Sequence, residues 1–592
     1  MILVVRGIDS YTPIKEILEN TYQPYHVCDI IIKEPHKGYP INKEIVKNSV
    51  SFYKPRIIFG KSYGSWIVAE SIDENIPIFL FSMPIKDGDK IFGFPNIKNV
   101  KTNLIYSLED PYFDKEIIDK NKDKYSKVLF LSGDHSLRPV NLDKISKIKK
   151  FILDSCGTKN FNSFSEDYLN KKKNARVSIV KKTNFYEEVP FNKIRSKVDE
   201  SLKFALNKNY GPVTNIVKRK SPVENLFVYQ SNILDTSKVN PLVKNSAATG
   251  GIGVSYDEKI AINKSIFEAL ERYSLTLSIV DFVVKKYDEI PHFLRVDKKE
   301  LVFHTKSQMK THNLRDALKE KIHWTVIRDA FDNKEKLYPV QLIIPNDLGY
   351  MIRETSSSGT ALGKTKEQAL THGLREAIER NSLMMWFYGL SEVKSKKIEL
   401  NKRKMPKKLL KIYNDISKKG FKFKTYLIDF HGFNTVFTLA FNENELYIGS
   451  SCGGYNEAIS GALEEIIITS FFAKTLRGII PKKPEEIKNL PQHFLYYQGK
   501  LKFQLLNYLD SISKDKVRID RSKFDYVKAS KLLQKKGYNV YYKDITAPEL
   551  RGRFFVIKVI IPGFLDVIKN NSLSWDGYYK IKKKPNLPTP FA

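Results

Sequence analysis

The sequence predicts two domains of different class: an N-terminal α/β domain with a mostly parallel sheet, and a large C-terminal α+β domain. In residues 1–155, short apolar runs alternate with helical patterns, which is typical of strands covered by helices on both faces. Residues 156–190 are polar, and we interpret them as a linker. Between residues 191 and 592, several β-type runs and three strongly helical segments indicate one large domain.

The expected strands are short apolar runs bounded by turns or helical patterns. In the N-terminal domain they are Ile2–Val5, Arg56–Phe59, Ile78–Phe81, Leu104–Tyr106 and Lys127–Leu131. In the C-terminal domain the clearest β-type runs are Tyr338–Ile344, Val436–Phe441 and Phe554–Ile561. No repeat of the length found in solenoid proteins is evident.

The chain has a formal net charge of +33, from 99 Lys and Arg against 66 Asp and Glu. Lysine is abundant throughout, so we interpret the charge mainly as solvated surface. A groove for an acidic peptide or nucleotide and a nucleic-acid surface are the alternatives. No nucleic-acid-binding motif, signal peptide or run of 18 apolar residues occurs. We therefore expect a cytoplasmic protein without nucleic-acid or membrane partners. Three widely spaced cysteines argue against disulfides.

One N-terminal segment, Gly60–Gly64, fits the G-x-S-x-G pattern of a nucleophile elbow. A predicted strand precedes it and a predicted helix, Ser65–Ile72, follows it. The glycines allow a turn tight enough to expose the Ser62 hydroxyl at the end of the strand. We therefore predict that Ser62 is a nucleophile. A glycine-bounded turn in which Ser62 only packs is the alternative.

An acid and a base, Asp110 and His135, follow later predicted strands. Carboxyl ends of parallel strands meet at one edge of a sheet, so these side chains can converge with Ser62. His135 would remove the serine proton, and Asp110 would orient the imidazole. The backbone N–H of Tyr63 and one from Arg6–Ile8 would bind the oxyanion. With this order of residues, the segment resembles small serine hydrolases of the α/β-hydrolase superfamily.

Three C-terminal segments share one pattern, in which a glycine-containing turn leads into a helix with several carboxylates. The turns are TGGIG (249–253), SSSGTALG (356–363) and SSCGG (450–454). The charged helix residues are Glu268, Glu271 and Arg272, then Glu376, Glu379 and Arg380, then Glu457, Glu464 and Glu465. In the first helix, spacings of three and four place Glu268, Glu271 and Arg272 on adjoining parts of one face. Carboxylates bind Mg²⁺ and arginine binds phosphate, so the pattern predicts a Mg-triphosphate site. An exposed charged helix face is the alternative.

These segments resemble the ATP-site regions of the YcaO family. TGGIG with EALER (268–272) resembles the first region, SSSGTALG with REAIER (375–380) the second, and ALEE (462–465) the third. Downstream, DIT (544–546) and KVIIPGF (558–564) resemble a later strand and a V-x-x-P-G element of the family. The resemblance runs from about residue 220 to the end of the chain.

The resemblance implies that ATP and Mg²⁺ bind through these regions. The implied nucleotide-site residues are Glu268, Glu271, Arg272, Ser357, Ser358, His372, Glu376, Glu379, Arg380 and Glu465. The implied Mg²⁺ ligands are Glu268, Glu271, Glu376 and Glu379. In azoline-forming members a proline-rich C-terminus reaches the active site, so Pro590 and Ala592 are further catalytic candidates here. A frayed terminus is the alternative.

The implied reaction is cyclodehydration of a ribosomally made precursor peptide. A Cys, Ser or Thr side chain attacks the preceding amide carbonyl, ATP phosphorylates the resulting oxygen, and loss of phosphate leaves an azoline ring. Residues 1–155 resemble a hydrolase, so a separate protein is expected to bind the leader peptide. A homodimer is left open. Thioamide or amidine formation is a second hypothesis, and a degenerate scaffold with only the hydrolase active is a third.

Overall fold

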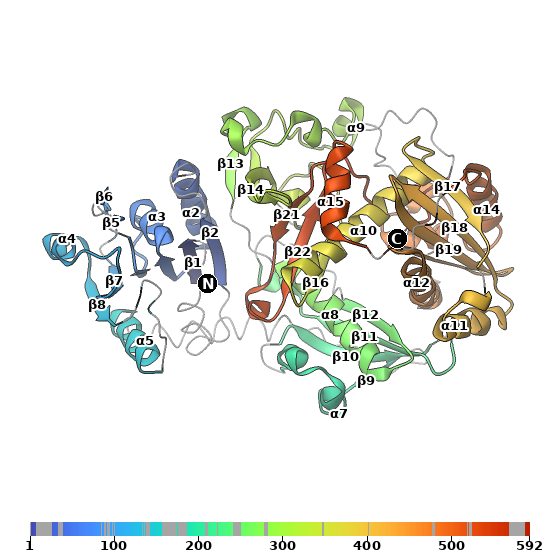
Figure 1. Ribbon diagram of the computed structural model, residues 1–592, viewed down its shortest axis with the longest axis horizontal. Coiled ribbons are helices and arrows are strands. Elements are labelled where there is room, and N and C mark those ends of the chain that lie inside the picture. Colours follow the sequence, from blue (N-terminus) through green and yellow to red (C-terminus); the bar gives the residue numbers. More distant parts are fainter. Residues whose placement is uncertain are drawn as a thin grey trace.

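Two unlike domains lie side by side in the computed structural model (Figure 1). The structure describes the following residues: 2–7, 27–32, 39–84, 86–87, 90–91, 95–97, 99, 101–132, 134, 137, 142–156, 175, 186–207, 211–221, 223–240, 250–277, 282–345, 348–400, 402–475, 480–517, 519, 522, 524–567 and 587–591.

In the described part of the N-terminal domain, six parallel strands form one sheet, in the order β2-β1-β3-β4-β7-β8. The strands are β1 (Ile2–Gly7), β2 (Val27–Ile32), β3 (Ile57–Lys61), β4 (Ile78–Phe81), β7 (Thr102–Ser107) and β8 (Lys127–Leu131). The helices are α2 (Tyr39–Tyr53), α3 (Tyr63–Ser71), α4 (Lys115–Lys120) and α5 (Leu142–Cys156). A small hairpin joins β5 (Lys86–Asp87) to β6 (Lys90–Ile91). The predicted parallel α/β domain is confirmed.

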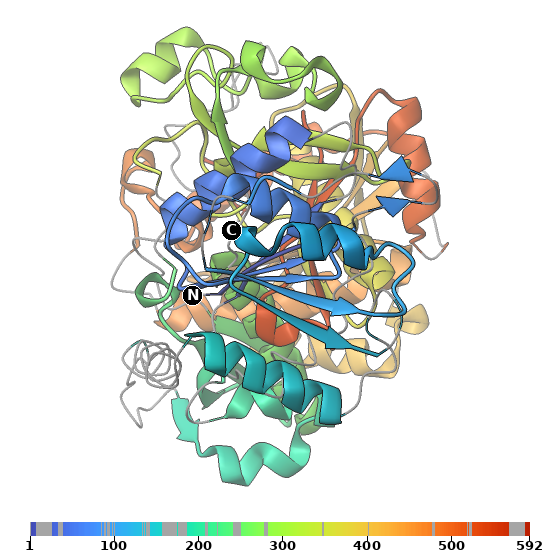
Figure 2. The same cartoon turned by 90° about the vertical axis from the view of Figure 1, so that its left-hand side faces the viewer.

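Successive residues of each strand face opposite sides of this sheet, and each side has its own apolar cover. Leu3 and Val5 belong to the hydrophobic cluster that includes α2 and α3, whereas Val4 belongs to the cluster that includes α5. Both sides are therefore buried, as expected for a parallel sheet. Figure 2 shows α2 on one side of the strands and α5 on the other.

The C-terminal domain contains antiparallel sheets. The first has the order β12-β11-β10-β9, with β9 (Tyr186–Val189), β10 (Val213–Arg219), β11 (Phe227–Ile233) and β12 (Gly250–Ser255). The second has the order β13-β14-β21-β22-β16, with β13 (Val283–Lys285), β14 (Ile322–Asp329), β16 (Thr360–Gly363), β21 (Tyr541–Asp544) and β22 (Phe555–Ile560), and β15 (Glu335–Pro339) pairs with β14. The third is β17 (Val393–Ile398), β18 (Lys422–Phe430), β19 (Phe433–Phe441) and β20 (Leu446–Cys452).

Helices pack on these sheets, and three long ones bring charged residues together. The long helices are α8 (Glu258–Leu277), α10 (Lys366–Phe387) and α12 (Tyr455–Thr475). The others are α7 (Phe191–Ile194), α9 (Lys306–Thr311), α11 (Lys407–Ser417), α13 (Leu490–Tyr496), α14 (Leu501–Ile512) and α15 (Tyr526–Lys535). The start of α10 is capped by Thr365, whose hydroxyl accepts the Gln368 N–H at 3.2 Å.

Two features differ from the strand assignments made from sequence. The run Tyr338–Ile344 is not one strand, because β15 ends at Pro339 and a 3₁₀ turn, Val340–Leu342, follows. Proline lacks the N–H that would extend the ladder. β9 lies within the stretch interpreted as a linker and pairs with β10, so it belongs to the first C-terminal sheet.

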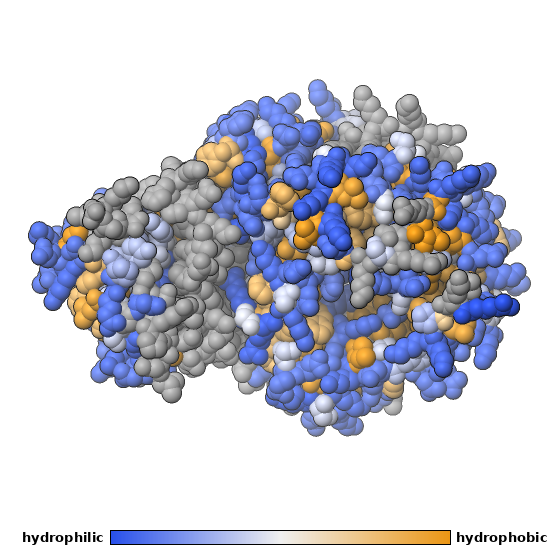
Figure 3. Space-filling model, viewed as in Figure 1, coloured by the Kyte–Doolittle hydropathy of each residue, from blue (hydrophilic) through white to orange (hydrophobic). Residues whose placement is uncertain are grey.

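The surface is strongly polar, in keeping with the composition. On the face shown in Figure 3, hydrophilic residues predominate and hydrophobic residues form scattered patches. Among the described helices, none combines the length and apolar character needed to cross a bilayer.

Candidate active sites

The three glycine-containing turns of the C-terminal domain build three strand–helix units: β12 with α8, β16 with α10, and β20 with α12. In each unit the helix lies so close to the strand that a side chain on the strand glycine would collide with it. A Cβ at Gly251 would lie 2.2 Å from the Ser265 carbonyl oxygen, and one at Gly449 would lie 2.0 Å from that of Ala462. Only glycine allows this approach.

One glutamate of each helix accepts a hydrogen bond from the strand or turn of its own unit. The bonds are Ile252 N–H to Glu268 at 2.9 Å, Gly359 N–H to Glu376 at 3.0 Å, and Ser450 N–H to Glu465 at 2.5 Å. The three units therefore use one arrangement, in which a helix carboxylate meets a backbone donor next to the glycine turn.

A second glutamate links each of the first two units to the next. Glu271 of α8 accepts the Leu362 N–H of β16 at 3.3 Å. Glu379 of α10 accepts the Cys452 N–H of β20 at 3.1 Å and the Ser450 hydroxyl at 2.7 Å. The units are thereby joined in series, and carboxylates from α8, α10 and α12 converge on one region.

The helices of the first two units each contribute an arginine, and the charge of Arg380 also acts on Glu465 of the third unit. Arg272 lies 3.5 Å from Glu268, and Arg380 lies 3.9 Å from both Glu376 and Glu379. At the corresponding helix position of the third unit, Thr469 donates to the Ile448 carbonyl at 2.7 Å. The third unit therefore supplies Glu465 without an arginine of its own.

Burial makes several of these carboxylates difficult to ionise. Desolvation raises the pKa of Glu271 to about 8 although Arg272 opposes the shift, and it raises the pKa of Glu376. Burial likewise raises the pKa of Glu465 to about 7. The exposed side-chain fraction falls from 38% for Glu268 to 11% for Glu379, so Glu268 is the more accessible of these two carboxylates.

These residues fit a magnesium nucleotide. No three acidic, histidine or cysteine side chains among the described residues form a ready-made metal centre. Each carboxylate nevertheless has more acceptor capacity than one or two hydrogen bonds use. A divalent cation would favour ionisation of carboxylates whose pKa burial raises, and Arg272 and Arg380 offer guanidinium groups to phosphate.

The structure also locates the other residues implied for the nucleotide site. Ser357 lies in the turn before β16, where its carbonyl accepts the Thr360 N–H at 2.9 Å. The Ser358 hydroxyl donates to Asp566 at 2.6 Å. His372 lies one turn before Glu376, and burial followed by the charge of Arg375 lowers its pKa.

Two residues of this region, the buried Lys558 and the partly buried Asp566, were missed from the sequence. Lys558 of β22 donates to the carbonyls of Ser356 and Ser358 at 2.9 and 2.6 Å, and burial lowers its pKa to about 8. Asp566 accepts both serine hydroxyls. Lys558 and Asp566 line a cavity together with Arg380. A lone lysine inside an apolar strand, FVIKVI, was the available signal for Lys558.

The C-terminal tail is docked rather than frayed. Residues 588–591 are buried, and the Pro588 carbonyl accepts the Tyr497 hydroxyl. The Phe591 ring packs edge-on against Phe437 of β19 at 5.3 Å. Phe437 lies opposite Ser450 in the sheet, so the two side chains share a face, and Ser450 donates to Glu379. Pro590 is buried with the rest of the tail, while Ala592 lies outside the described residues.

The family model described as YcaO cyclodehydratase, ATP- and Mg²⁺-binding, matches residues 251–565, which is more than half of the chain. The chain belongs to the YcaO family. This confirms the resemblance inferred from the three glycine turns, and with it the ATP and Mg²⁺ cofactors.

Two solved structures illustrate the similarity of this chain to known proteins. A heterocyclase in complex with substrate and cofactor has a TM-score of 0.50 and 13% identity, over 100% of this chain and 85% of that chain. The E. coli microcin synthetase McbBCD complex has a TM-score of 0.45 and 15% identity, over 64% of this chain and 97% of that chain. No curated protein matches the chain.

Beside its YcaO region, the chain is similar at its N-terminal end to the esterase domain of a Rhodothermus marinus protein. That similarity covers 26% of this chain and 83% of that domain, with 12% identity and a TM-score of 0.20. The multidomain fold class predicted from sequence, a parallel α/β sheet followed by a larger α+β domain, is confirmed.

The predicted nucleophile elbow of the N-terminal domain has strained geometry. Ser62 lies between β3 and α3 with φ 54° and ψ −130°, a conformation that non-glycine residues rarely adopt. A Cβ at Gly60 would lie 2.7 Å from Ser65 Cα, so glycine is required for the tight turn. Such strain is typical of functional turns, and it supports the interpretation of Ser62 as a nucleophile.

The other proposed triad residues lie at the same edge of the sheet as far as the structure describes them. Asp110 follows β7, is 5% exposed, and accepts the Tyr112 N–H at 2.9 Å. His135 follows β8 but lies outside the described residues. β3, β7 and β8 are parallel, so residues that follow them share the carboxyl edge. The triad itself stays a prediction.

Lys61, beside the proposed nucleophile, was also missed from the sequence. It is fully buried, and burial lowers its pKa to about 7, while the charges of Asp110 and Asp134 oppose that shift. The site around Ser62 therefore contains a buried lysine, whose charged form burial disfavours, as well as a buried carboxyl group. A lysine that ends the apolar run IIFGK was the available signal.

Proposed function

We propose that the protein uses Mg-ATP to convert Cys, Ser or Thr residues of a ribosomally made precursor peptide into azolines, and that its N-terminal domain is a serine hydrolase. The observation that carries the first part is the series of carboxylates from α8, α10 and α12, with Arg272 and Arg380 among them. Its position in a YcaO cyclodehydratase region supports the reaction class.

Glu268, Glu271, Glu376 and Glu379 would hold Mg²⁺, and Arg272 and Arg380 would bind the phosphates of ATP. Bound Mg-ATP supplies a phosphoryl group that turns the amide oxygen of the substrate into a leaving group. The backbone hydrogen bonds fix each carboxylate before the nucleotide arrives, so little reorganisation is needed on binding.

The docked tail favours azoline formation over the sibling YcaO chemistries. Pro588 and Pro590 restrict the backbone, and the contacts of Tyr497 and Phe591 bury the tail next to the sheet face of Ser450. An ordered tail can form one wall of a peptide site. Thioamide or amidine formation remains the second candidate, because the same nucleotide site would serve it.

The substrate is proposed to be presented by a separate leader-binding protein, since the described residues of the N-terminal domain form a parallel α/β sheet and a strained serine turn. The hydrolase is proposed to use Ser62 as nucleophile, His135 as base and Asp110 as its orienting acid. Its substrate class is open.

The test of the ATP assignment compares Mg-ATP binding by calorimetry in the wild type, Glu268→Ala and Glu367→Ala. Glu367 is exposed on α10, nine residues before Glu376 and thus on the opposite side of that helix. We expect Glu268→Ala to lose ATP hydrolysis while remaining folded, and Glu367→Ala to behave as wild type. Unchanged Mg-ATP affinity in Glu268→Ala would refute the assignment.

The test of the peptide reaction uses mass spectrometry of a cognate precursor after incubation with Mg-ATP. Azoline formation by cyclodehydration removes one water per ring. A product that instead exchanges oxygen for sulfur would identify thioamide chemistry. An amidine would show condensation with an amine.

A further inference from the structure

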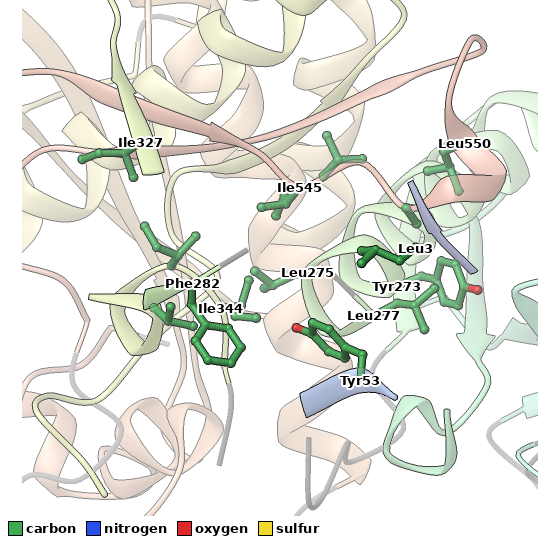
Figure 4. Close-up of a cluster of buried hydrophobic side chains, with 14 of the residues drawn as sticks. Leu3, Tyr53, Tyr273, Leu275, Leu277, Phe282, Ile327, Ile344, Ile545 and Leu550 are labelled. Carbon is green, nitrogen blue, oxygen red and sulfur yellow. The ribbon is translucent and has the colours of Figure 1, made fainter. Parts of the chain in front are cut away.

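The N-terminal α/β domain and the YcaO domain share a buried hydrophobic cluster. Leu3 of β1 and Tyr53 of α2 lie in the same cluster as Tyr273, Leu275 and Leu277 at the end of α8 (Figure 4). The opposite side of the sheet, with α5, forms a separate cluster. The side that carries α2 is therefore built as an interface with the YcaO domain.

Specific contacts fix α2 against β13 and the residue before it, Phe282. Glu44 forms an ion pair with Lys285 at 2.7 Å, and both side chains are partly shielded from solvent. The Asn48 amide donates to the Phe282 carbonyl at 3.5 Å. The Tyr53 and Phe282 rings meet edge-on at 6.5 Å. An ion pair, a directional hydrogen bond and an aromatic pair together define one docking orientation.

The segment of α8 that this interface covers comes directly after two residues of the candidate ATP site, Glu271 and Arg272. The Thr276 hydroxyl donates to the Arg272 carbonyl at 2.9 Å, within one helical turn. On another side, the Tyr273 hydroxyl donates to Glu549 at 2.9 Å. The end of α8 thus lies between the N-terminal domain and the Glu549 segment, and a shift there would move Glu271 and Arg272.

We propose that the N-terminal domain is an intramolecular docking partner that holds the end of α8, and with it Glu271 and Arg272, in the position needed for Mg-ATP. The position of Glu271 and Arg272 then depends on the docking surface of α2 and does not depend on the chemistry of Ser62. This inference rests on the proposed ATP-dependent function. It assigns the domain a second role, as a positioning element of the other active site.

The test is a charge swap in the full-length chain. Glu44→Lys and Lys285→Glu each place like charges opposite one another, and the double variant restores an ion pair. We expect each single change to raise the KM for Mg-ATP by about fivefold, which corresponds to the upper range of a partly exposed ion pair. The double variant should recover most of the loss. Lys47→Glu, at an exposed position of α2, should leave ATP turnover unchanged.

A second readout follows the helix end itself. Amide hydrogen exchange of residues 270–277 should accelerate in each single variant and return to the wild-type rate in the double variant. Single variants with wild-type exchange and KM, a double variant without recovery, or a Lys47→Glu variant with a KM raised as much as in the single variants would each overturn the docking role. If the wild type fails to bind Mg-ATP, the proposed function is wrong, whereas the exchange experiment still decides whether the interface holds α8.

Discussion

The two candidate sites are held in place by different kinds of contact. Around Ser62, the chemistry depends on one strained turn and on residues that follow separate strands. In the YcaO domain, each carboxylate belongs to a long helix and binds the backbone of a strand, sometimes in the next unit. The first site therefore depends on a few residues at one edge of a single sheet. The second depends on how whole elements pack.

The largest expected effect is a reciprocal loss of the two activities. Ser62→Ala should abolish labelling by a serine-reactive fluorophosphonate and leave ATP hydrolysis intact. Glu376→Ala should lower ATP hydrolysis by roughly 100-fold or more, because a preorganised charged group is removed from the site, and should leave labelling intact. Glu367→Ala is the control on the same helix. Equal labelling of wild type and Ser62→Ala would contradict the assignment of Ser62 as the nucleophile.

Deleting Leu587–Ala592 should cripple peptide modification while Mg-ATP binding persists, because the tail meets the sheet face that holds Ser450 rather than the arginines. Mass spectrometry of the precursor and calorimetry with Mg-ATP measure the two effects. Phe591→Leu keeps an apolar residue in the buried position and serves as the control for stability. Undiminished ring formation by the truncated enzyme would exclude the tail from the reaction.

Two glycine changes should each damage only one site. Gly251→Ala forces apart β12 and α8 and should cost about 1–3 kcal/mol of stability together with Mg-ATP affinity. Gly60→Ala crowds the turn of Ser62 and should lower fluorophosphonate labelling alone. Thermal unfolding and both activity assays report the outcome. Loss of both activities in either variant would mean that a local change at one site also disturbs the other site.

The smallest expected effect is a pH dependence of the YcaO site. Burial raises the pKa of Glu271 from 4.5 to about 8, so the folded, ligand-free protein retains a proton that the unfolded chain releases. The contribution of this proton to the free energy of unfolding is fully present at low pH. It is lost as pH rises toward 8, by at most about 1.4 kcal/mol per pH unit. Mg-ATP needs the ionised carboxylate, so its affinity should rise over the same range. Calorimetry of wild type and Glu271→Gln checks this. A wild-type affinity independent of pH would contradict it.

Much of the fold and of both candidate sites was visible in the sequence because their signals are local. The strands Ile78–Phe81 and Lys127–Leu131 have the predicted bounds, and the turn at Ser62 follows from its flanking glycines. The prediction of a single strand over Tyr338–Ile344 was wrong, because apolar character alone does not distinguish a strand from a buried 3₁₀ turn. Lys558 and Asp566 were missed because no local spacing connects them to Ser358.

The sequence by itself determined the elements, the glycine turns and the charged residues of each helix, because periodicity and turn chemistry act over a few neighbouring residues. Only the tertiary structure decided which backbone donor each carboxylate binds. Glu271 meets Leu362, 91 positions away, and the end of α8 meets the N-terminal domain through Leu3 and Tyr53. Such contacts depend on the packing of whole sheets and helices, so no local pattern in the chain could have specified them.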